Sequence, residues 1–569
     1  MRQYPLASNS GSVAKAIGVI ADTANHEVVR EFFELFKTPW EFYQAHRQYD
    51  VLICAGDQRL DATAKLVLLY AGARAHFDDR HGIETDSKFE GARILSYRGN
   101  RLPIYGSTVA FPGKRTALLA DESSRECVAY LARSEDTILG RVGYDLFAEV
   151  GTLLTAGQPA ANAAIPALDL HIAILRDLIT SNGVSLVEIP PVPDGYQFIA
   201  CLTHDIDHPS IRQHGWDHTT LGFLYRALFG SLRSLLRRRI SLRDLIANWM
   251  AALKLPFVHL GLAEDFWLKF DDRYLELEKG VCSTFFVIPF RDRPGTTFPS
   301  NGRVPAFRAA RYGARDIANA LRKLAAAGCE IGLHGIDAWT DSAGGCEELE
   351  EIRRLTGASR IGVRMHWLYF DRQSPAVLEK ADAAYDSTIG YNETVGYRAG
   401  TTQVYKPPAA TQLLELPLHV MDTALFYSAY LGLSPREART ILGRMIENVV
   451  HFGGCFTVNW HDRSVTPERL WDRCYSELVE ELKKNRAWFA TSGQATSWFR
   501  KRRSALFESD CTQPYGVGAT VDAAQRDDSP GLRLRIHKAR ESFAPGPYSS
   551  EDYVDIAIDE RMAARACVD

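Results

Sequence analysis

The sequence lacks the features that mark membrane-spanning, secreted and thiolate-metal proteins. It has no stretch of about 18 or more uncharged apolar residues, so we expect no transmembrane helix. Its first residues do not join a basic start to an unbroken apolar core, so we expect no signal peptide. The ten cysteines never form a Cys-x-x-Cys pair, which argues against a disulfide framework and a thiolate zinc site. The sequence therefore predicts a protein of the reducing cytoplasm.

The chain also lacks a motif or a charge balance typical of nucleotide or nucleic-acid binding. The first third contains neither G-x-G-x-x-G nor G-x-x-x-x-G-K-[ST]. The formal net charge of −4 supplies no global basic field for nucleic acid. Hydrophobic residues make up 46% and charged residues 24% of the 569 residues, as in globular proteins with large cores. At about 100–200 residues per domain, this length predicts roughly two to four domains.

A proline-rich break at 188–196 (EIPPVPDGY) predicts a domain boundary. Before it, helical and strand-like patterns alternate. We expect helices over 27–36 and 61–75 and a strand over 50–56. Residues 1–190 are therefore expected to form a smaller N-terminal α/β domain, and the sequence assigns it no role.

Residues 197–500 repeat a strand-then-helix alternation, which predicts a parallel sheet, open or closed into a barrel. The strand-like runs are QFIACLTH, STFFVIPF, CEIGLHG, RIGVRMHW, LLELPLH and CFTVNWH. Helix-length segments such as 314–328 separate them. Beyond about 505 the chain turns polar, so we expect a poorly ordered tail over 505–569.

Residues 210–270 interrupt this alternation with two helical patterns. Apolar residues follow an i, i+3, i+4, i+7 spacing from 221 to 236. Ser241 and Asp244 form a capping-box-like start for the next helix, and Pro256 is expected to end it.

The helical segment allows two interpretations, and three arginines at 237–239 lie between its helices. It is either an insertion packed on its own domain, or an interfacial helix pair over 221–254. In the second case it would contact a membrane surface or a lipid-linked substrate.

The strand-like runs of the second region end in side chains that can bind metal or transfer protons. Parallel α/β folds place their reactive groups at the carboxyl ends of strands. Carboxylates and imidazoles are costly to bury unless they are paired or hold a metal. The pattern therefore predicts a metal or acid–base site. The residues concerned are Asp205, Asp207, His334, Arg364, His366, His419, Asp422, His461 and Asp462.

A mixed set of histidine and aspartate suits zinc or another borderline divalent ion. A catalytic metal lowers the pKa of a bound water from about 16 to about 7. Alternate residues of a strand share a face, so Asp205 and Asp207 point to one side if 203–207 stay extended. One carboxylate would then hold the metal while the other takes a proton.

The order of these segments resembles the polysaccharide deacetylase (NodB-homology) superfamily of metal-dependent deacetylases. T-H-D-I-D at 203–207 is similar to a variant of the family's first motif, and STFFVIPF at 283–290 is similar to its second strand. EIGLHG, the VR pair at 363–364 and NWH at 459–461 resemble three later motifs. The resemblance covers roughly residues 197–500 and implies a distorted (β/α) barrel.

The resemblance also implies a role for each matching residue. Asp205 would be the catalytic base, oriented by Arg364. Asp207 and His334 would bind the metal, with zinc as the expected ion. His461 would be the general acid.

One position departs from the family's pattern. The usual second motif is His-x-x-x-His with both histidines on the metal, but the residue four after His334 is Ala338. Asp337 could swing in from the next helical turn. His366 could serve instead, on the same strand face as Arg364, and it is the ligand that we expect. An absent or altered metal site is the remaining alternative.

Four further residues could lie near the site. Arg398 and Trp460 are expected to contact substrate. Asp422 would pair with an arginine or with His461. His419 is expected to be structural.

These patterns predict a cytoplasmic, metal-dependent hydrolase that removes an acetyl group from an N-acetylated sugar, polymeric or lipid-linked. A related hydrolase of a small cyclic or linear amide is the first alternative. A barrel without metal that binds carbohydrate or acts as a scaffold is the second. We expect no nucleic-acid partner, and peripheral contact with the inner membrane would run through 221–254.

Overall fold

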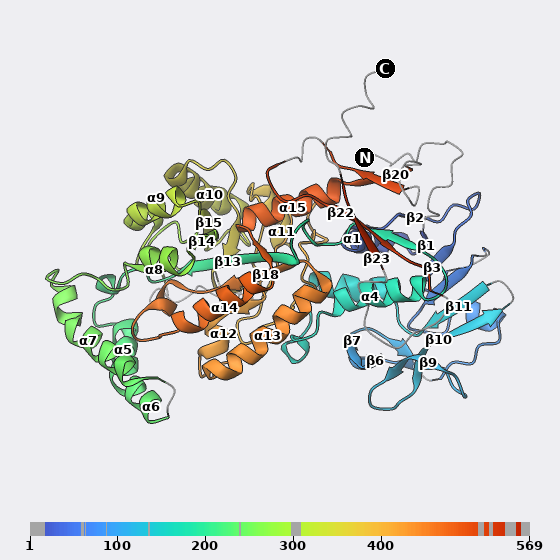
Figure 1. Ribbon diagram of the computed structural model, residues 1–569, viewed down its shortest axis with the longest axis horizontal. Helices are drawn as coiled ribbons and strands as arrows, with labels where there is room; N and C mark the ends of the chain where they lie inside the picture. The colour runs from blue at the N-terminus through green and yellow to red at the C-terminus, as the bar shows by residue number, and fades with distance from the viewer. Residues whose placement is uncertain are drawn as a thin grey trace, which may run out of the picture. The chain divides into compact units, whose positions relative to one another are not determined.

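The computed structural model describes residues 17–58, 62, 64–86, 88–134, 137–237, 240–296, 309–509, 517–522, 527–540 and 553–558. The chain forms two compact units (Figure 1). Unit 1 comprises Met1–Leu153, Ala167–Asp194 and Trp498–Asp569, and unit 2 comprises Leu154–Pro166 and Gly195–Ser497. The change of unit after Asp194 falls inside the proline-rich segment 188–196.

Unit 1 contains a nine-stranded mixed sheet in the order β2-β1-β3-β4-β11-β10-β9-β6-β7. The pairs from β2 to β11 are parallel, and the remaining pairs are antiparallel. The strands are β1 (Ile17–Ile20), β2 (Trp40–Phe42), β3 (Val51–Ala55), β4 (Leu66–Tyr70), β6 (Arg93–Tyr97), β7 (Asn100–Ile104), β9 (Ala117–Asp121), β10 (Cys127–Ser134) and β11 (Thr137–Val142). A separate two-stranded sheet joins β5 (Lys88–Phe89) and β8 (Thr108–Val109).

The helices of this part of the chain are α1 (His26–Phe36), α2 (His76–Arg80), α3 (Leu146–Thr155) and α4 (Ala167–Thr180). The helix expected over 27–36 and the strand expected over 50–56 are confirmed by α1 and β3. The helix expected over 61–75 is wrong, because residues 66–70 form β4. Every residue of β4 is buried between β3 and β11. A short apolar run that is buried on both faces has no period that separates a strand from a helix.

The C-terminal region differs from the expected tail over 505–569. Its described residues include β20 (Leu506–Ser509), β21 (Val517–Thr520), β22 (Arg533–His537) and β23 (Tyr553–Ala557). Strand β22 pairs with β23 and with β12 (Leu186–Glu188). Leu532, Leu534 and Ile536 are buried. The alternation of apolar and polar residues at 532–537 is that of a half-buried strand, and the high polarity of the surrounding residues obscures it.

Unit 2 contains a parallel seven-stranded sheet in the order β16-β15-β14-β13-β18-β17, with β19 also pairing with β13. The strands are β13 (Phe198–Ile206), β14 (Ser283–Val287), β15 (Glu330–Gly335), β16 (Val363–Met365), β17 (Val420–Met421), β18 (Cys455–Asn459) and β19 (Ala487–Phe489). All nine residues of the central strand β13 are buried, so this strand is covered on both faces.

The expected (β/α) barrel is present as a parallel half-barrel sheet. Five of the six expected strands form, but LLELPLH (413–419) makes only isolated bridges at Glu415, to Asp386 and to Tyr405, before β17. Pro417 lies inside this run and lacks the N–H that a ladder needs. Isolated bridges from Val363 to Asp386 and from Asp386 to Glu415 continue the backbone pairing beyond β16.

Helices accompany this sheet: α8 (Phe270–Leu277), α9 (Ala318–Ala326), α10 (Ser342–Thr356), α11 (Ser374–Lys380), α12 (Asp422–Phe426), α13 (Pro435–Phe452), α14 (Asp472–Lys484) and α15 (Ser492–Ser504). Their ends follow local sequence signals. Ser434 and Glu437 form a capping box at the start of α13, where Pro435 occupies the first turn. Asp341 caps the start of α10, and Gly357 ends that helix in the left-handed conformation.

The expected insertion at 210–270 is helical and is visible as a separate group of helices in Figure 1. It contains α5 (His218–Tyr225), the π-helical segment η4 (Arg226–Gly230), α6 (Ser231–Leu236) and α7 (Leu242–His259). Pro256 does not end α7, which continues to His259. Among the described residues, no helix is long and apolar enough to cross a membrane.

Gly362, the residue before β16, tests how tightly this sheet is packed. A Cβ atom there would overlap the buried ring of Tyr385. We expect Gly362→Ala to destabilise the protein by about 3 kcal/mol, because overpacking in a dense core forces backbone shifts. A Cβ atom on Gly443 in α13 would meet no described residue within 4 Å beyond its own helix turn, so Gly443→Ala should stabilise the helix by about 0.5–1 kcal/mol. Thermal unfolding of both variants checks the pair, and an unchanged midpoint for Gly362→Ala would contradict the packing.

Candidate metal-binding active site

The parallel strands of unit 2 bring five polar residues to one edge of the sheet. Asp205 lies near the end of β13 and Asp207 directly follows that strand. His334 lies near the end of β15. His366 follows β16, and His461 comes two residues after β18. Because the carboxyl ends of parallel strands share one edge, the sheet itself places these side chains together.

Three of these residues point electron pairs at a common centre. Asp207 Oδ1 lies 3.4 Å from His334 Nε2 and 3.4 Å from His366 Nδ1. The two imidazole nitrogens are 3.0 Å apart. His334 donates its Nδ1–H to the carbonyl oxygen of Arg364, 3.0 Å away, so its Nε2 carries the free electron pair.

This donor set fits a divalent metal ion. With metal–ligand bonds of about 2.0–2.1 Å, tetrahedral ligands lie roughly 3.3–3.4 Å apart, close to the separations found here. Asp207 Oδ1 is buried and has no hydrogen-bond partner among the described residues. An orphaned buried carboxylate oxygen facing two imidazoles is costly unless a cation lies between them. One carboxylate and two imidazoles are ligands that zinc and similar ions accept.

The protonation of these groups also suits a metal. Burial opposes charge on Asp207, but the neighbouring histidines hold the pKa of its carboxyl well below the usual value. Burial lowers the pKa of His366. An ionised carboxylate and a neutral imidazole are the forms that bind metal.

His366, and not Asp337, lies beside His334. The Asp337 carboxylate accepts hydrogen bonds from the N–H of Thr296 and from Arg293, which hold it elsewhere. The expected strand position of His366 is wrong, however, because β16 ends at Met365.

A turn therefore places His366. The next residues, Trp367 and Leu368, have φ values of 59° and 55°. Non-glycine residues adopt this left-handed region at a cost, and such residues gather at functional sites.

A buried hydrogen-bond network surrounds the candidate base, Asp205. Its Oδ1 accepts from Arg364 Nη1 at 3.1 Å, and its Oδ2 accepts from Asn459 Nδ2 at 2.7 Å. Arg364 is fully buried and also donates to Thr203 Oγ1 and to both the carbonyl and the hydroxyl of Ser387. The carboxylate is therefore fixed in one orientation.

Of the two partners expected for Asp422, an arginine or His461, the structure shows His461. Its Nδ1 lies 2.6 Å from Asp422 Oδ1, and its backbone N–H donates to Asp422 Oδ2 at 2.7 Å. Burial alone would lower the pKa of His461, but the Asp422 carboxylate overrides it and raises that pKa to about 10. The other ring nitrogen, Nε2, lies 3.8 Å from Asp207 Oδ2. A protonated imidazole therefore faces the metal-capable cluster.

The two residues that were expected to contact substrate, Trp460 and Arg398, have other contacts. Trp460 is fully buried and its ring packs on Phe426 and Tyr475, so the expected substrate contact is wrong for this side chain. Arg398 is half-buried and donates to the carbonyl of Gly390. Its guanidinium also lies over two aromatic rings, so its described contacts do not include the cluster.

Four other histidines have structural settings. His204, which precedes Asp205 on β13, is buried and pairs with Glu278 and with the carbonyl of Trp460. His419 is buried, and burial lowers its pKa to about 4. His208 and His214 form a hydrogen-bonded pair that continues to Asp217, the cap of α5.

Asn459, Thr203 and Ser387 were not identified as site residues from the sequence. Asn459 and Thr203 lie opposite one another in the β13–β18 register, beside the functional strand ends. That position is the signal that could have found them. Ser387 lies in an irregular segment, and nothing in the local sequence marks it.

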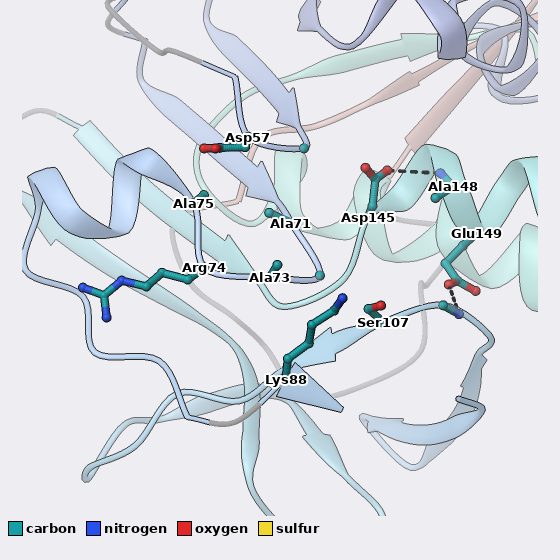
Figure 2. A pocket seen from close by; sticks show the side chains of 13 residues that line it. Asp57, Ala71, Ala73, Arg74, Ala75, Lys88, Ser107, Asp145, Ala148 and Glu149 are labelled. Carbon is teal, nitrogen blue, oxygen red and sulfur yellow. Dashed lines mark hydrogen bonds between the residues drawn. The ribbon is translucent and has the colours of Figure 1, made fainter. Parts of the chain in front are cut away.

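A separate cavity of about 270 Å³ lies in unit 1 (Figure 2). It is found at the carboxyl ends of β3, β4 and β11, where parallel sheets commonly bind ligands. Its acidic side chains already have hydrogen-bond partners within the protein, because Asp57, Asp145 and Glu149 all accept hydrogen bonds from backbone N–H groups. Lys88 pairs with Glu90. These contacts identify no class of ligand for the cavity.

No protein-family profile and no curated protein sequence matches the chain. Solved structures similar to part of it include a protein provisionally assigned as a polysaccharide deacetylase from Mycobacterium smegmatis. That structure is 18% identical, has a TM-score of 0.33, and the match covers 55% of this chain and 95% of the other.

Two other structures are similar to about half of the chain. An allantoinase is 13% identical with a TM-score of 0.32, over 54% of this chain and 91% of the other. A peptidoglycan N-acetylglucosamine deacetylase is 14% identical with a TM-score of 0.26, over 53% of this chain and 88% of the other. These identities and TM-scores are low, so the similarity assigns no function to this chain.

Metal analysis of purified protein tests the cluster. We expect about one divalent ion per chain in the wild type after zinc is supplied, as for a single three-ligand site. His366→Ala should weaken metal binding by at least about 100-fold, because it removes a direct ligand. Asp337→Ala is the matched control and should keep the ion. Loss of metal in Asp337→Ala with retention in His366→Ala would contradict this ligand set, as would a wild type that binds none.

Proposed function

We propose that the chain is a metal-dependent hydrolase of carbon–nitrogen bonds that removes an acetyl group from an N-acetylated sugar, polymeric or lipid-linked. The observation that carries the proposal is the meeting of three kinds of group at one sheet edge. These are the metal-capable cluster, the oriented carboxylate of Asp205 and the protonated imidazole of His461.

Asp207, His334 and His366 would hold the metal ion, with zinc as the expected species. When bound, such an ion polarises a carbonyl oxygen and lowers the pKa of water at the site. The protein supplies the remaining chemistry through residues that hold or move protons.

Asp205 acts as the general base. It takes one proton from the attacking water, whose oxygen forms a bond to the acetyl carbonyl carbon. The guanidinium of Arg364 and the amide of Asn459 keep the carboxylate in one orientation while it does so. General-base catalysis by a positioned group contributes about 10²–10⁴-fold to a rate.

His461 acts as the general acid. As the carbon–nitrogen bond breaks, the Nε2 proton passes to the departing amine, and the products are acetate and the free amino sugar. Asp422 supports this role by holding the Nδ1–H and by keeping the ring protonated before the step. The base and the acid thus return to their starting states after one proton moves from Asp205 to His461 through solvent.

Two rival functions share parts of this site. A hydrolase of a small cyclic or linear amide would use the same residues, and substrate screening separates it from a sugar deacetylase. A metal-free binding or scaffold protein is opposed by the orphaned Asp207 Oδ1 between two imidazoles.

Acetate release from N-acetylated sugars tests the proposal. The zinc-loaded protein should release acetate from at least one member of a panel of N-acetylhexosamine oligomers and lipid-linked N-acetyl sugars. Asp205→Asn should lower that rate by about 10²–10⁴-fold, since it removes the proton acceptor. Its metal content should stay that of the wild type, because Asp205 is not among the three ligands. Acetate release by Asp205→Asn at the wild-type rate would contradict the assignment.

The pH dependence of the same reaction tests the acid. The acid form of His461 is lost as the pH rises through its pKa, so activity should fall on the basic side. Asp422→Asn removes the carboxylate that raises this pKa, and the basic limb should move to lower pH by about 1–3 units. Ser464→Ala, which removes only a hydroxyl that donates to Asp422, is the control and should move the limb less. An unchanged limb in Asp422→Asn would exclude His461 as the acid.

A further inference from the structure

The helical insertion exposes two apolar stripes with the same spacing. Along α5, η4 and α6, apolar side chains recur at i, i+4, i+7, i+8, i+11 and i+15, which is one face of a continuous helix. Along α7 the same series recurs. The members are Leu221, Tyr225, Leu228, Phe229, Leu232 and Leu236 in the first stripe, and Leu242, Ile246, Trp249, Met250, Leu253 and Phe257 in the second. Each exposes more than a third of its surface.

The opposite faces of these helices are packed in the ordinary way. The inner side of α7 contributes Ala251, Leu255 and Val258 to a small core, where they meet Phe223 and Trp267. The insertion therefore has its own core on one side. The side chains of the two outward stripes are not part of that core.

The two stripes adjoin one another. The indole Nε1–H of Trp249, in the second stripe, donates to the carbonyl oxygen of Leu228, in the first, at 3.4 Å. We call the twelve side chains together the apolar face. Their exposed surface is on the order of 1,000 Å², whereas the largest apolar patch on a typical monomer is about 300–600 Å².

Basic side chains accompany the apolar face. Residues 218–260 contain seven arginines and lysines but one acidic residue, in a chain whose formal net charge is −4. That acidic residue, Asp244, is bound to Ser241 in the cap of α7. Among the basic residues Arg233, Arg237, Arg243 and Lys254 are exposed; Arg238 and Arg239 lie outside the described residues.

We propose that the apolar face docks on the surface of a lipid bilayer that carries anionic head groups. Leucine and phenylalanine would enter the acyl boundary, while tryptophan and tyrosine suit the head-group level. The surrounding arginines and lysine would contact the anionic head groups. A wide apolar face with basic flanks is typical of helices that lie in the plane of a membrane interface.

Charge argues against a second copy of the chain as the occupant. A two-fold dimer brings the same patch of both subunits together. Two segments that each carry a formal excess of six positive charges would then face one another, and like charges at an interface are unfavourable. An anionic bilayer offers acyl chains to the apolar side chains and negatively charged head groups to the basic ones.

Sedimentation of the full-length protein with lipid vesicles tests the proposal. We expect binding to phosphatidylcholine vesicles that contain about 30 mol% phosphatidylglycerol, and at least about tenfold weaker binding to pure phosphatidylcholine. Raising the salt to about 0.5 M should weaken the binding, because salt screens the attraction of the basic residues.

Paired variants separate the apolar contribution from the charge. Leu236→Gln with Leu253→Gln should weaken vesicle binding by at least about tenfold, since it removes inserted apolar groups without changing the charge. Leu506→Gln, at an exposed leucine of β20 in unit 1, is the matched control and should bind as the wild type does. Arg233→Gln with Arg237→Gln should weaken binding to the anionic vesicles specifically.

The outcomes distinguish this surface from the catalytic site. Asp205→Asn should bind vesicles like the wild type, so a failed deacetylase assignment leaves the docking surface intact. A wild type that does not sediment with anionic vesicles would overturn the proposal. The proposal would also be overturned if the Leu236→Gln, Leu253→Gln double variant still bound vesicles fully. It would be overturned too if the wild type bound no vesicles but self-associated, and this double variant abolished the self-association.

Discussion

The buried guanidinium of Arg364 connects the candidate base to the metal-capable cluster. Its side chain holds Asp205, while its carbonyl oxygen accepts the hydrogen bond that orients His334. Both connections depend on the β15–β16 register, in which His334 and Arg364 are opposite one another. Breaking a buried ion pair costs about 3–5 kcal/mol. A displacement of β16 would therefore disturb the base and a metal ligand together.

His366 and His461 are both buried, but their pKa values are shifted in opposite directions. His366 shares the Asp207 carboxylate with His334, and burial lowers the pKa of His366, which favours the neutral form that a metal requires. His461 is also buried, but Asp422 contacts both its ring and its backbone and keeps the ring protonated. The same imidazole side chain can therefore serve as a ligand in one position and as a proton donor in the other.

The strand ends could be read from the sequence because parallel strands share a reactive edge, and Asp205, His334 and Arg364 follow that rule. The turn that places His366 depends on the left-handed backbone conformations of Trp367 and Leu368 after β16, which no residue pattern predicts. Trp460 could not be placed either, since burial of a tryptophan depends on tertiary neighbours. The strand at 66–70 and the pairing of β22 with β12 depend on contacts distant in sequence, which local periodicity does not contain.

The pairing of β12 with β22 has a consequence for the order in which the chain folds. Unit 1 cannot complete this sheet until the last segment has been synthesised, and the two strands are separated by all of 195–497. Closing so long a loop carries an entropic cost that grows with its length. In unit 2, however, Phe198 lies opposite Ala487 in the β13–β19 ladder. Once unit 2 has folded, its own ends are neighbours, and the chain left between β12 and β22 outside that ladder shortens to about 50 residues.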